Sequence, residues 1–138
     1  MNADSIDSLS KSVLGAIFEV SNTPGAGFPE KVYQRTPLRE LRLRGIRATA
    51  EDAFAAIYKG QPVGEYFADI VVEDELVAEL KCAERISGEH TALCLIYLRA
   101  SGRTVCLPVN FHRPKVEWKR IVRGFPVSDP PEMPAAAR

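Results

Sequence analysis

The chain has 138 residues, of which 46% are hydrophobic and 26% charged, and its formal net charge at pH 7 is zero. These values indicate one globular domain with a core, and they exclude a protein whose overall charge attracts nucleic acid or membranes. Because no apolar run reaches about 18 residues and the N-terminus lacks an apolar signal segment, we expect a cytoplasmic protein with no membrane partner.

Two helices are predicted before any strand. The first covers about residues 4–20, where apolar side chains recur at spacings of three and four. A segment rich in proline and glycine interrupts it, and a second helix is expected over about residues 29–44, before Gly45. Pro37 lies inside this second helix and is expected to kink it or split it.

Three extended segments follow the helices. Residues 46–58, 62–72 and 76–82 read as strands, and Lys59 with Gly60 forms the turn between the first two. Consecutive strands joined by short turns pair antiparallel, so these segments predict a meander.

A third helix is predicted from its cap at Ser87 through Ala100. Its expected inward residues are Leu93, Ile96, Tyr97 and Ala100. Ser101 and Gly102 then stop the helix.

The remaining segments complete the fold. Residues 103–110 predict another strand and 115–122 a short final element, whereas residues 124–138 are a proline-rich tail outside a single domain of residues 1–123. The order α-α-β-β-β-α-β predicts an α/β protein of the α+β kind, with helices packed on a mixed sheet.

Three cysteines lie in apolar contexts: Cys82, Cys94 and Cys106. No two of them form a CxxC pair, so a zinc site is not expected. An odd number of cysteines in a protein without a secretory signal predicts reduced thiols that pack in the interior.

A pair of carboxylates is predicted within the second and third strands. Alternation places Glu79 and Lys81 on one face, and a three-residue loop after Val72 would place Asp69 opposite Glu79, at roughly 5 Å between Cβ atoms. An even loop would put the two acids on opposite faces. Like charges at that distance repel, and Mg²⁺ or Mn²⁺ would relieve the repulsion. The alternative is an ion pair with Lys81 on a solvated face, and spacing alone leaves both open.

These acids and an upstream segment together resemble a known family. The pattern D…ExK on adjacent strands resembles the PD-(D/E)XK nuclease superfamily, and Gly27 to Tyr33 spell G-x-x-E-x-x-Y, the signature of small bacterial GxxExxY proteins. The resemblance extends to about Val122. It implies a restriction-endonuclease-like αβββαβ core with an extra N-terminal helix. It also implies hydrolysis by a Mg²⁺- or Mn²⁺-dependent phosphodiesterase, a nuclease.

The resemblance also implies a role for each polar residue of the strands. Asp69, Glu79 and the carbonyl of Leu80 would bind the metal, and Lys81 would orient or activate the attacking water. Glu30, at the start of the second helix, would hold a metal-bound water. These five residues form the expected catalytic centre.

Four further positions bear on the resemblance. Tyr33 and His90 match the family and are possible outer partners of the site, with a packing tyrosine and a structural histidine as the alternatives. Leu93 and Ile96 stand where the family commonly has glutamine and asparagine, and an apolar side chain there can neither donate nor accept a hydrogen bond. These two departures put the positioning of a substrate in doubt.

Two groups of basic residues are candidates for contacts to phosphate. Arg35, Arg39 and Arg42 form one stripe of the second helix, with a solvated helix face as the alternative. A second group lies near the end of the domain: Arg113, Lys115, Lys119, Arg120 and Arg123. No aromatic interleaving accompanies them, so no sequence specificity is expected.

The sequence therefore favours a small metal-dependent nuclease that acts on DNA or RNA. The alternative is a catalytically impaired nuclease-fold module that binds nucleic acid or a protein partner, and a third reading is hydrolysis of another phosphoester. The substrate, the pathway and the oligomeric state are left open.

Overall fold

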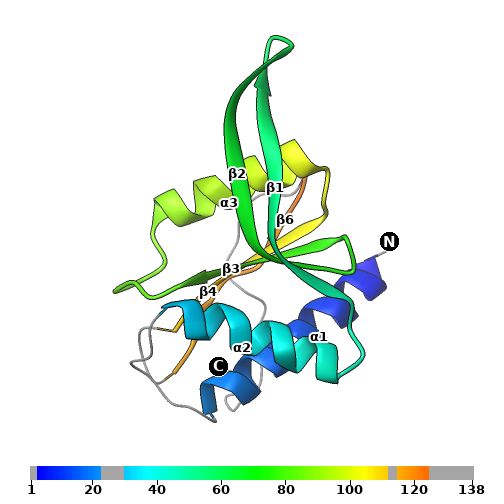
Figure 1. Ribbon diagram of the computed structural model, residues 1–138, viewed down its shortest axis with the longest axis vertical. Helices are drawn as coiled ribbons and strands as arrows, with labels where there is room; N and C mark the ends of the chain where they lie inside the picture. The colour runs from blue at the N-terminus through cyan, green and yellow to red at the C-terminus, as the bar shows by residue number, and fades with distance from the viewer. Residues whose placement is uncertain (1–2, 23–29, 112–114, 125–138) are drawn as a thin grey trace.

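The computed structural model describes residues 3–22, 30–111 and 115–124. The start of the G-x-x-E-x-x-Y segment, Arg113 and the proline-rich tail after Gly124 lie outside the described residues. The elements, shown in Figure 1, are α1 (Ala3–Asn22), α2 (Glu30–Leu43), β1 (Ala48–Tyr58), β2 (Gln61–Val72), β3 (Leu76–Lys81), α3 (Gly88–Ser101), β4 (Val105–Asn110), β5 (Glu117–Trp118) and β6 (Ile121–Val122). This order confirms the predicted α-α-β-β-β-α-β succession.

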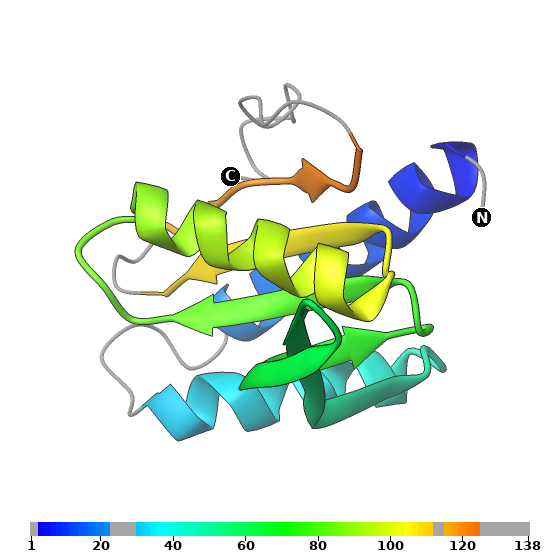
Figure 2. The ribbon, with the colours of Figure 1, turned by 90° about the horizontal axis from the view of Figure 1, so that it is seen from above.

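The strands form one mixed sheet, as predicted. Its order is β1-β2-β3-β4-β5, with β6 also pairing with β4. Strands β3 and β4 are parallel because α3 connects them as a crossover, and the other pairs are antiparallel. Helices α1 and α2 bury their apolar residues against one face of the sheet, while α3 packs on the other face (Figure 2).

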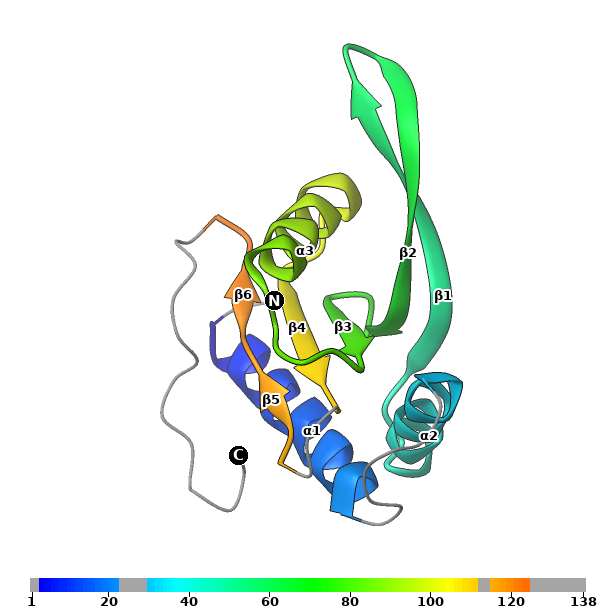
Figure 3. The ribbon, with the colours of Figure 1, turned by 90° about the vertical axis from the view of Figure 1, so that its left-hand side faces the viewer.

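Strands β1 and β2 extend well beyond the sheet. Their ladder runs from Ala48↔Val72 to Tyr58↔Gln61, whereas β3 pairs with β2 only at residues 70–72. Residues 53–67 therefore form an arm that projects from the rest of the molecule (Figure 3). The arm ends in the predicted turn, where Lys59 and Gly60 have positive φ angles of 46° and 79°.

Helix α2 continues through Pro37, so the expected split is wrong. Tyr33 and Leu41, one turn on either side of this proline, are 2% and 1% exposed, and Pro37 itself is buried. Burial of both halves against the same core outweighs the loss of one main-chain hydrogen bond. Helix α1 begins at Ala3, within the ordinary uncertainty of a helix end.

Helix α3 has the predicted ends but a different buried face. Cys94, Tyr97 and Leu98 are buried, whereas Ile96 is 38% exposed and Ala100 is also exposed, which corrects two of the four expected inward positions. The helix is apolar on most sides, so its spacing could not select a face. Contacts with distant strands select it instead: the Tyr97 ring meets those of Phe54 and Tyr66 edge-on, at centroid distances of 5.1 and 5.4 Å.

The cysteines follow the expectation in part. Cys94 and Cys106 are buried free thiols whose sulfur atoms lie 2.6 Å apart, between α3 and β4. Cys82 is exposed, contrary to the expectation, because the chain leaves the sheet directly after Lys81. Within the described parts of the chain, no helix combines the length and apolar character needed to cross a bilayer.

Phe111→Ala should lower the free energy of unfolding by about 3–5 kcal/mol, because the ring is buried and stacks on Tyr33 at 4.6 Å. Phe67→Ala is the matched control: this residue is 57% exposed on the arm, and its loss should change stability by about 0.5 kcal/mol or less. Urea denaturation measures both. Equal losses in the two variants would show that the stack contributes nothing to the core.

Candidate functional site

The site is built where β2 separates from β3. The turn at residues 73–75 has the expected three residues, with positive φ at Glu73 and Asp74, and it pairs Val72 with Leu76 as predicted. The paired residues end at Ile70↔Ala78. Continuing the same register places Asp69 opposite Glu79, at the point where β2 turns away into the arm. The two strands form a fork with an acid on each branch.

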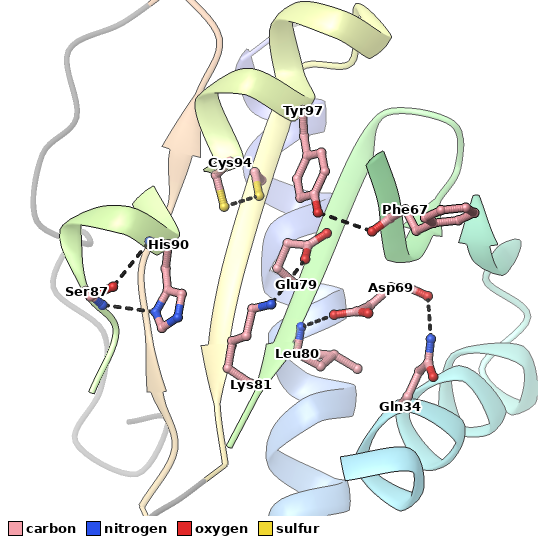
Figure 4. A network of polar contacts seen from close by, with 11 residues as sticks. Gln34, Phe67, Asp69, Glu79, Leu80, Lys81, Ser87, His90, Cys94 and Tyr97 are labelled. Carbon is pink, nitrogen blue, oxygen red and sulfur yellow. Dashed lines mark hydrogen bonds and ion pairs between the residues drawn. The ribbon is translucent and has the colours of Figure 1, made fainter. Parts of the chain in front are cut away.

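Asp69 takes the place of a main-chain partner at this fork. Its Oδ2 accepts a hydrogen bond of 2.8 Å from the main-chain N–H of Leu80 (Figure 4). Since the N–H and C=O of one residue leave a strand on the same edge, the Leu80 carbonyl also points into the fork. The neighbouring Lys81 carbonyl accepts from Phe111 on the β4 side, which fits this alternation. The Asp69 carboxylate and the Leu80 carbonyl therefore both face the space between β2 and β3 where the strand pairing has ended.

Glu79 is a buried acid. The residue is 3% exposed, and its Oε1 has no hydrogen-bond partner among the described residues. Burial, and then the charge of Asp69, raise the pKa of Glu79 to about 8, although Lys81 and a hydrogen bond with the main chain of Asp69 act in the opposite direction. Without a cation, the carboxyl group therefore keeps its proton at neutral pH.

Lys81 lies on the same face as Glu79, as alternation predicts. Its Nζ is 4.0 Å from Glu79 Oε2, at the limit of an ion pair, and its side chain is 27% exposed (Figure 4). This contact is too weak to offset the desolvation of Glu79, whose pKa stays raised. The face is not solvated at Glu79, so the geometry does not match a surface ion pair.

Two residues near the fork were missed by the sequence reasoning. The Gln34 side chain of α2 points toward Asp69, and its Nε2 donates to the Asp69 carbonyl at 3.4 Å (Figure 4). The Tyr97 hydroxyl of α3 donates to the Phe67 carbonyl at 3.3 Å, and burial followed by the charges of Glu79 and Asp69 raises its pKa. Gln34 carried a weak signal, because it follows Glu30 by one helical turn.

The outer residues suggested by the resemblance have different surroundings. Glu30 is the first residue of α2, and its side chain lies outside the described residues. Tyr33 is 2% exposed and stacks on Phe111, which favours the packing alternative. His90 completes a capping box: its Nδ1 accepts from the Ser87 N–H at 3.0 Å, and its own N–H donates to the Ser87 hydroxyl. This contact favours the structural alternative.

The arginine stripe of α2 is partly used by the fold. Arg35 and Arg39 are exposed, whereas the Arg42 guanidinium donates twice to the Ala48 carbonyl, at 3.1 and 3.3 Å. Among the described residues, neither Arg35 nor Arg39 makes such a contact with β1, and the stripe as a phosphate contact remains a prediction.

The second basic group also contributes to the fold. Arg120 forms an ion pair with Asp7 of α1, and Arg123 Nε donates to the Arg103 carbonyl at 2.9 Å. A cavity of about 290 Å³ lies beside the β2–β3 turn, and Arg47 and Arg103 are part of its lining. Arg47 forms an ion pair with Glu73 at 3.5 Å, and Arg103 forms one with Asp74 at 3.0 Å. Arg47, Arg103, Arg120 and Arg123 therefore have acidic or carbonyl partners away from the fork.

The donors at the fork suit a hard divalent cation. Two carboxylates and a main-chain carbonyl are oxygen ligands, the kind that Mg²⁺ and Mn²⁺ prefer. Among the described residues, no three His, Cys, Asp or Glu side chains gather into a metal-binding group, so the third ligand that this part of the chain offers is the Leu80 carbonyl. The orphaned oxygen of Glu79 is the observation that supports the fit.

Comparison with known proteins decides the family. The family model of the PD-(D/E)XK nuclease superfamily matches residues 7–121. This chain belongs to that superfamily. The match spans the fork, α2, α3, and most of α1 and of the sheet, and it agrees with the predicted restriction-endonuclease-like architecture. PD-(D/E)XK nucleases generally use divalent metals such as Mg²⁺. No curated protein and no solved structure matches this chain at a significant level.

The raised pKa of Glu79 should make stability depend on pH. The folded state holds this proton up to about pH 8, while the unfolded chain releases it near 4.5. With chelator present, the free energy of unfolding should therefore be highest below pH 4.5, as far as this residue is concerned. It should fall as pH rises toward 8, by on the order of a few kcal/mol. Glu79→Gln should flatten this dependence in urea denaturation between pH 5 and 8.5.

Glu65→Gln is the control, because this acid is exposed on the arm and its change should leave the slope as in the wild type. A Glu79→Gln variant with an unchanged slope would show that Glu79 is already ionised in the folded protein.

Proposed function

We propose that this protein is a metal-dependent nuclease that hydrolyses phosphodiester bonds of DNA or RNA without strong sequence specificity. The observation that carries the proposal is the buried Glu79, which lies opposite Asp69 at the strand fork beside Lys81 and has one oxygen without a hydrogen-bond partner among the described residues. A buried acid without a full set of partners costs stability, and its position next to a second acid points to a bound cation.

Asp69, Glu79 and the Leu80 carbonyl are the proposed ligands of Mg²⁺ or Mn²⁺, and Glu30 is the proposed outer carboxylate. When bound, a divalent cation would lower the pKa of a coordinated water and stabilise charge on the phosphoryl oxygens. Glu79 must release its proton before it can serve as a ligand. Cation affinity should accordingly increase as pH rises toward 8.

Lys81 is the proposed positioning group for the attacking water. Its ammonium is close enough to Glu79 to be drawn to the fork, yet its side chain is 27% exposed and can meet a substrate from solvent. Arg35 and Arg39 are the proposed phosphate contacts on α2, where both are exposed. Because the chain has no net charge, binding would depend on this local stripe.

The finer assignments belong to the same proposal. The G-x-x-E-x-x-Y segment, of which only Glu30 and the residues after it are described, supports membership of the GxxExxY group within the superfamily. A cytoplasmic location is likewise proposed from the sequence. The oligomeric state is left open.

A second candidate is a nuclease-fold module that binds a protein partner and has lost catalysis. The arm favours it, because it carries four exposed large apolar residues: Ile57, Tyr58, Val63 and Phe67. Exposed apolar groups gathered on one projection mark a contact surface more often than a solvated loop. The apolar side chains of Leu93 and Ile96 on α3 also fit impaired catalysis.

Lys81→Ala should remove nearly all Mg²⁺- or Mn²⁺-dependent cleavage while the melting temperature stays near that of the wild type. The residue is partly exposed and contributes to chemistry more than to packing. The assay uses single- and double-stranded DNA and RNA. Lys59→Ala, at the exposed turn of the arm, is the matched control and should keep full activity. Equal cleavage by the wild type and Lys81→Ala would identify a contaminant or the wrong residue.

Mn²⁺ should raise the melting temperature of the wild type by several degrees. At an Mn²⁺ concentration a hundred times Kd, binding adds about 2.7 kcal/mol to the free energy of unfolding. Asp69→Asn should abolish this shift. Without metal at pH 8 and above, it should melt higher than the wild type, because Asn can still accept from Leu80 and one of the two repelling charges is gone. No shift in the wild type, together with a less stable variant, would favour the ion-pair alternative.

A further inference from the structure

Helix α2 presents one amide side chain to the fork. Gln34 points at the main chain of β2, and its Nε2 donates to the Asp69 carbonyl, 3.4 Å away (Figure 4). The side chain is half-buried between α2 and the strand. Within the described residues the side chain of Gln34 contacts the main chain of Asp69, so it acts on the site through that residue.

The position of α2 relative to the fork is fixed by its neighbours. Tyr33, directly before Gln34, stacks on Phe111 with an interplanar angle of 12°, and the Phe111 N–H donates to the Lys81 carbonyl at 2.9 Å. At the other end of the helix, Arg42 holds the Ala48 carbonyl of β1. These contacts tie α2 to the β3 side of the fork and to β1, the neighbour of β2, so the Gln34 amide is held against β2.

The position of Asp69 in the sheet makes a second contact to its main chain useful. It lies one residue beyond the last β2–β3 pair, Ile70↔Ala78, at the point where β2 turns into the arm. Its carboxylate accepts a hydrogen bond from the Leu80 N–H at 2.8 Å. A second contact at its carbonyl would restrict rotation of the main chain that carries the carboxylate, as outer partners of metal ligands do.

We propose that Gln34 is a positioning residue that orients Asp69 for a divalent cation through the hydrogen bond from its side-chain amide to the Asp69 carbonyl. The inference rests on the proposed function, because it assumes that Asp69 binds the metal. Loss of an outer partner of this kind weakens metal binding by about 10–100-fold. With a contact of 3.4 Å, the expected loss is at the lower end of that range.

The experiment is calorimetric titration of Mn²⁺ into the full-length protein at pH 8. Gln34→Met keeps the length of the side chain and removes the donor, and it should weaken Mn²⁺ binding about tenfold. Gln61→Met makes the same chemical change at the exposed start of β2 and should bind like the wild type. Thr36→Val removes the 2.6 Å bond to the Val32 carbonyl within α2, and it tests loss of helix stability alone.

The outcomes distinguish the positioning role of Gln34 from the proposed function itself. Weaker Mn²⁺ binding by Gln34→Met, with wild-type affinity in Gln61→Met and Thr36→Val, supports the positioning role. Cleavage by Gln34→Met should then recover as Mn²⁺ approaches saturation. Wild-type affinity in Gln34→Met, or an equal loss in Thr36→Val, overturns the inference and leaves the proposed function standing. Absence of Mn²⁺ binding by the wild type overturns the proposed function and this inference with it.

Discussion

The separation of β2 from β3 is the constraint on which the site depends. In a continuous antiparallel ladder, main-chain groups would fill the space between the strands. Here the paired residues end at Ile70↔Ala78, and the Asp69 carboxylate takes the Leu80 N–H in place of a main-chain carbonyl. The neighbouring Glu79 is left beside that carboxylate inside the protein, where burial favours its neutral form. The separation of the two strands therefore accounts both for the main-chain groups of β3 that β2 does not pair and for the raised pKa of Glu79.

The same separation shapes the rest of the molecule. Once free of β3, strand β2 continues with β1 as the arm, whose outer residues such as Val63 and Phe67 stay exposed. The arm is held at its base by Tyr97 of α3, which also lies near the two acids. On the opposite face, Gln34 of α2 donates a hydrogen bond to the Asp69 carbonyl, and Tyr33 of the same helix is buried in the core. Helices on opposite faces of the sheet therefore contact the same part of β2, at Phe67 and Asp69.

Much of this arrangement follows from short-range signals. The cap at Ser87 and the left-handed residue Gly102 bound α3 as predicted, because a cap satisfies main-chain groups within one turn of the chain. The register of Asp69 and Glu79 was predictable for the same reason, since a three-residue turn determines pairing over the few residues that follow it. The match to the superfamily then agrees with the order of elements that these local signals predict.

The sequence by itself determined the elements and, for a three-residue turn, the register that pairs the two acids, because each depends on residues close together in the chain. Only the tertiary structure decided that Pro37 stays within a helix, that Ile96 faces outward and that Cys82 is exposed. The burial of Glu79 and the approach of Gln34 were decided there as well. These features depend on segments far apart in sequence, and packing free energy between them outweighs the preference of any single residue.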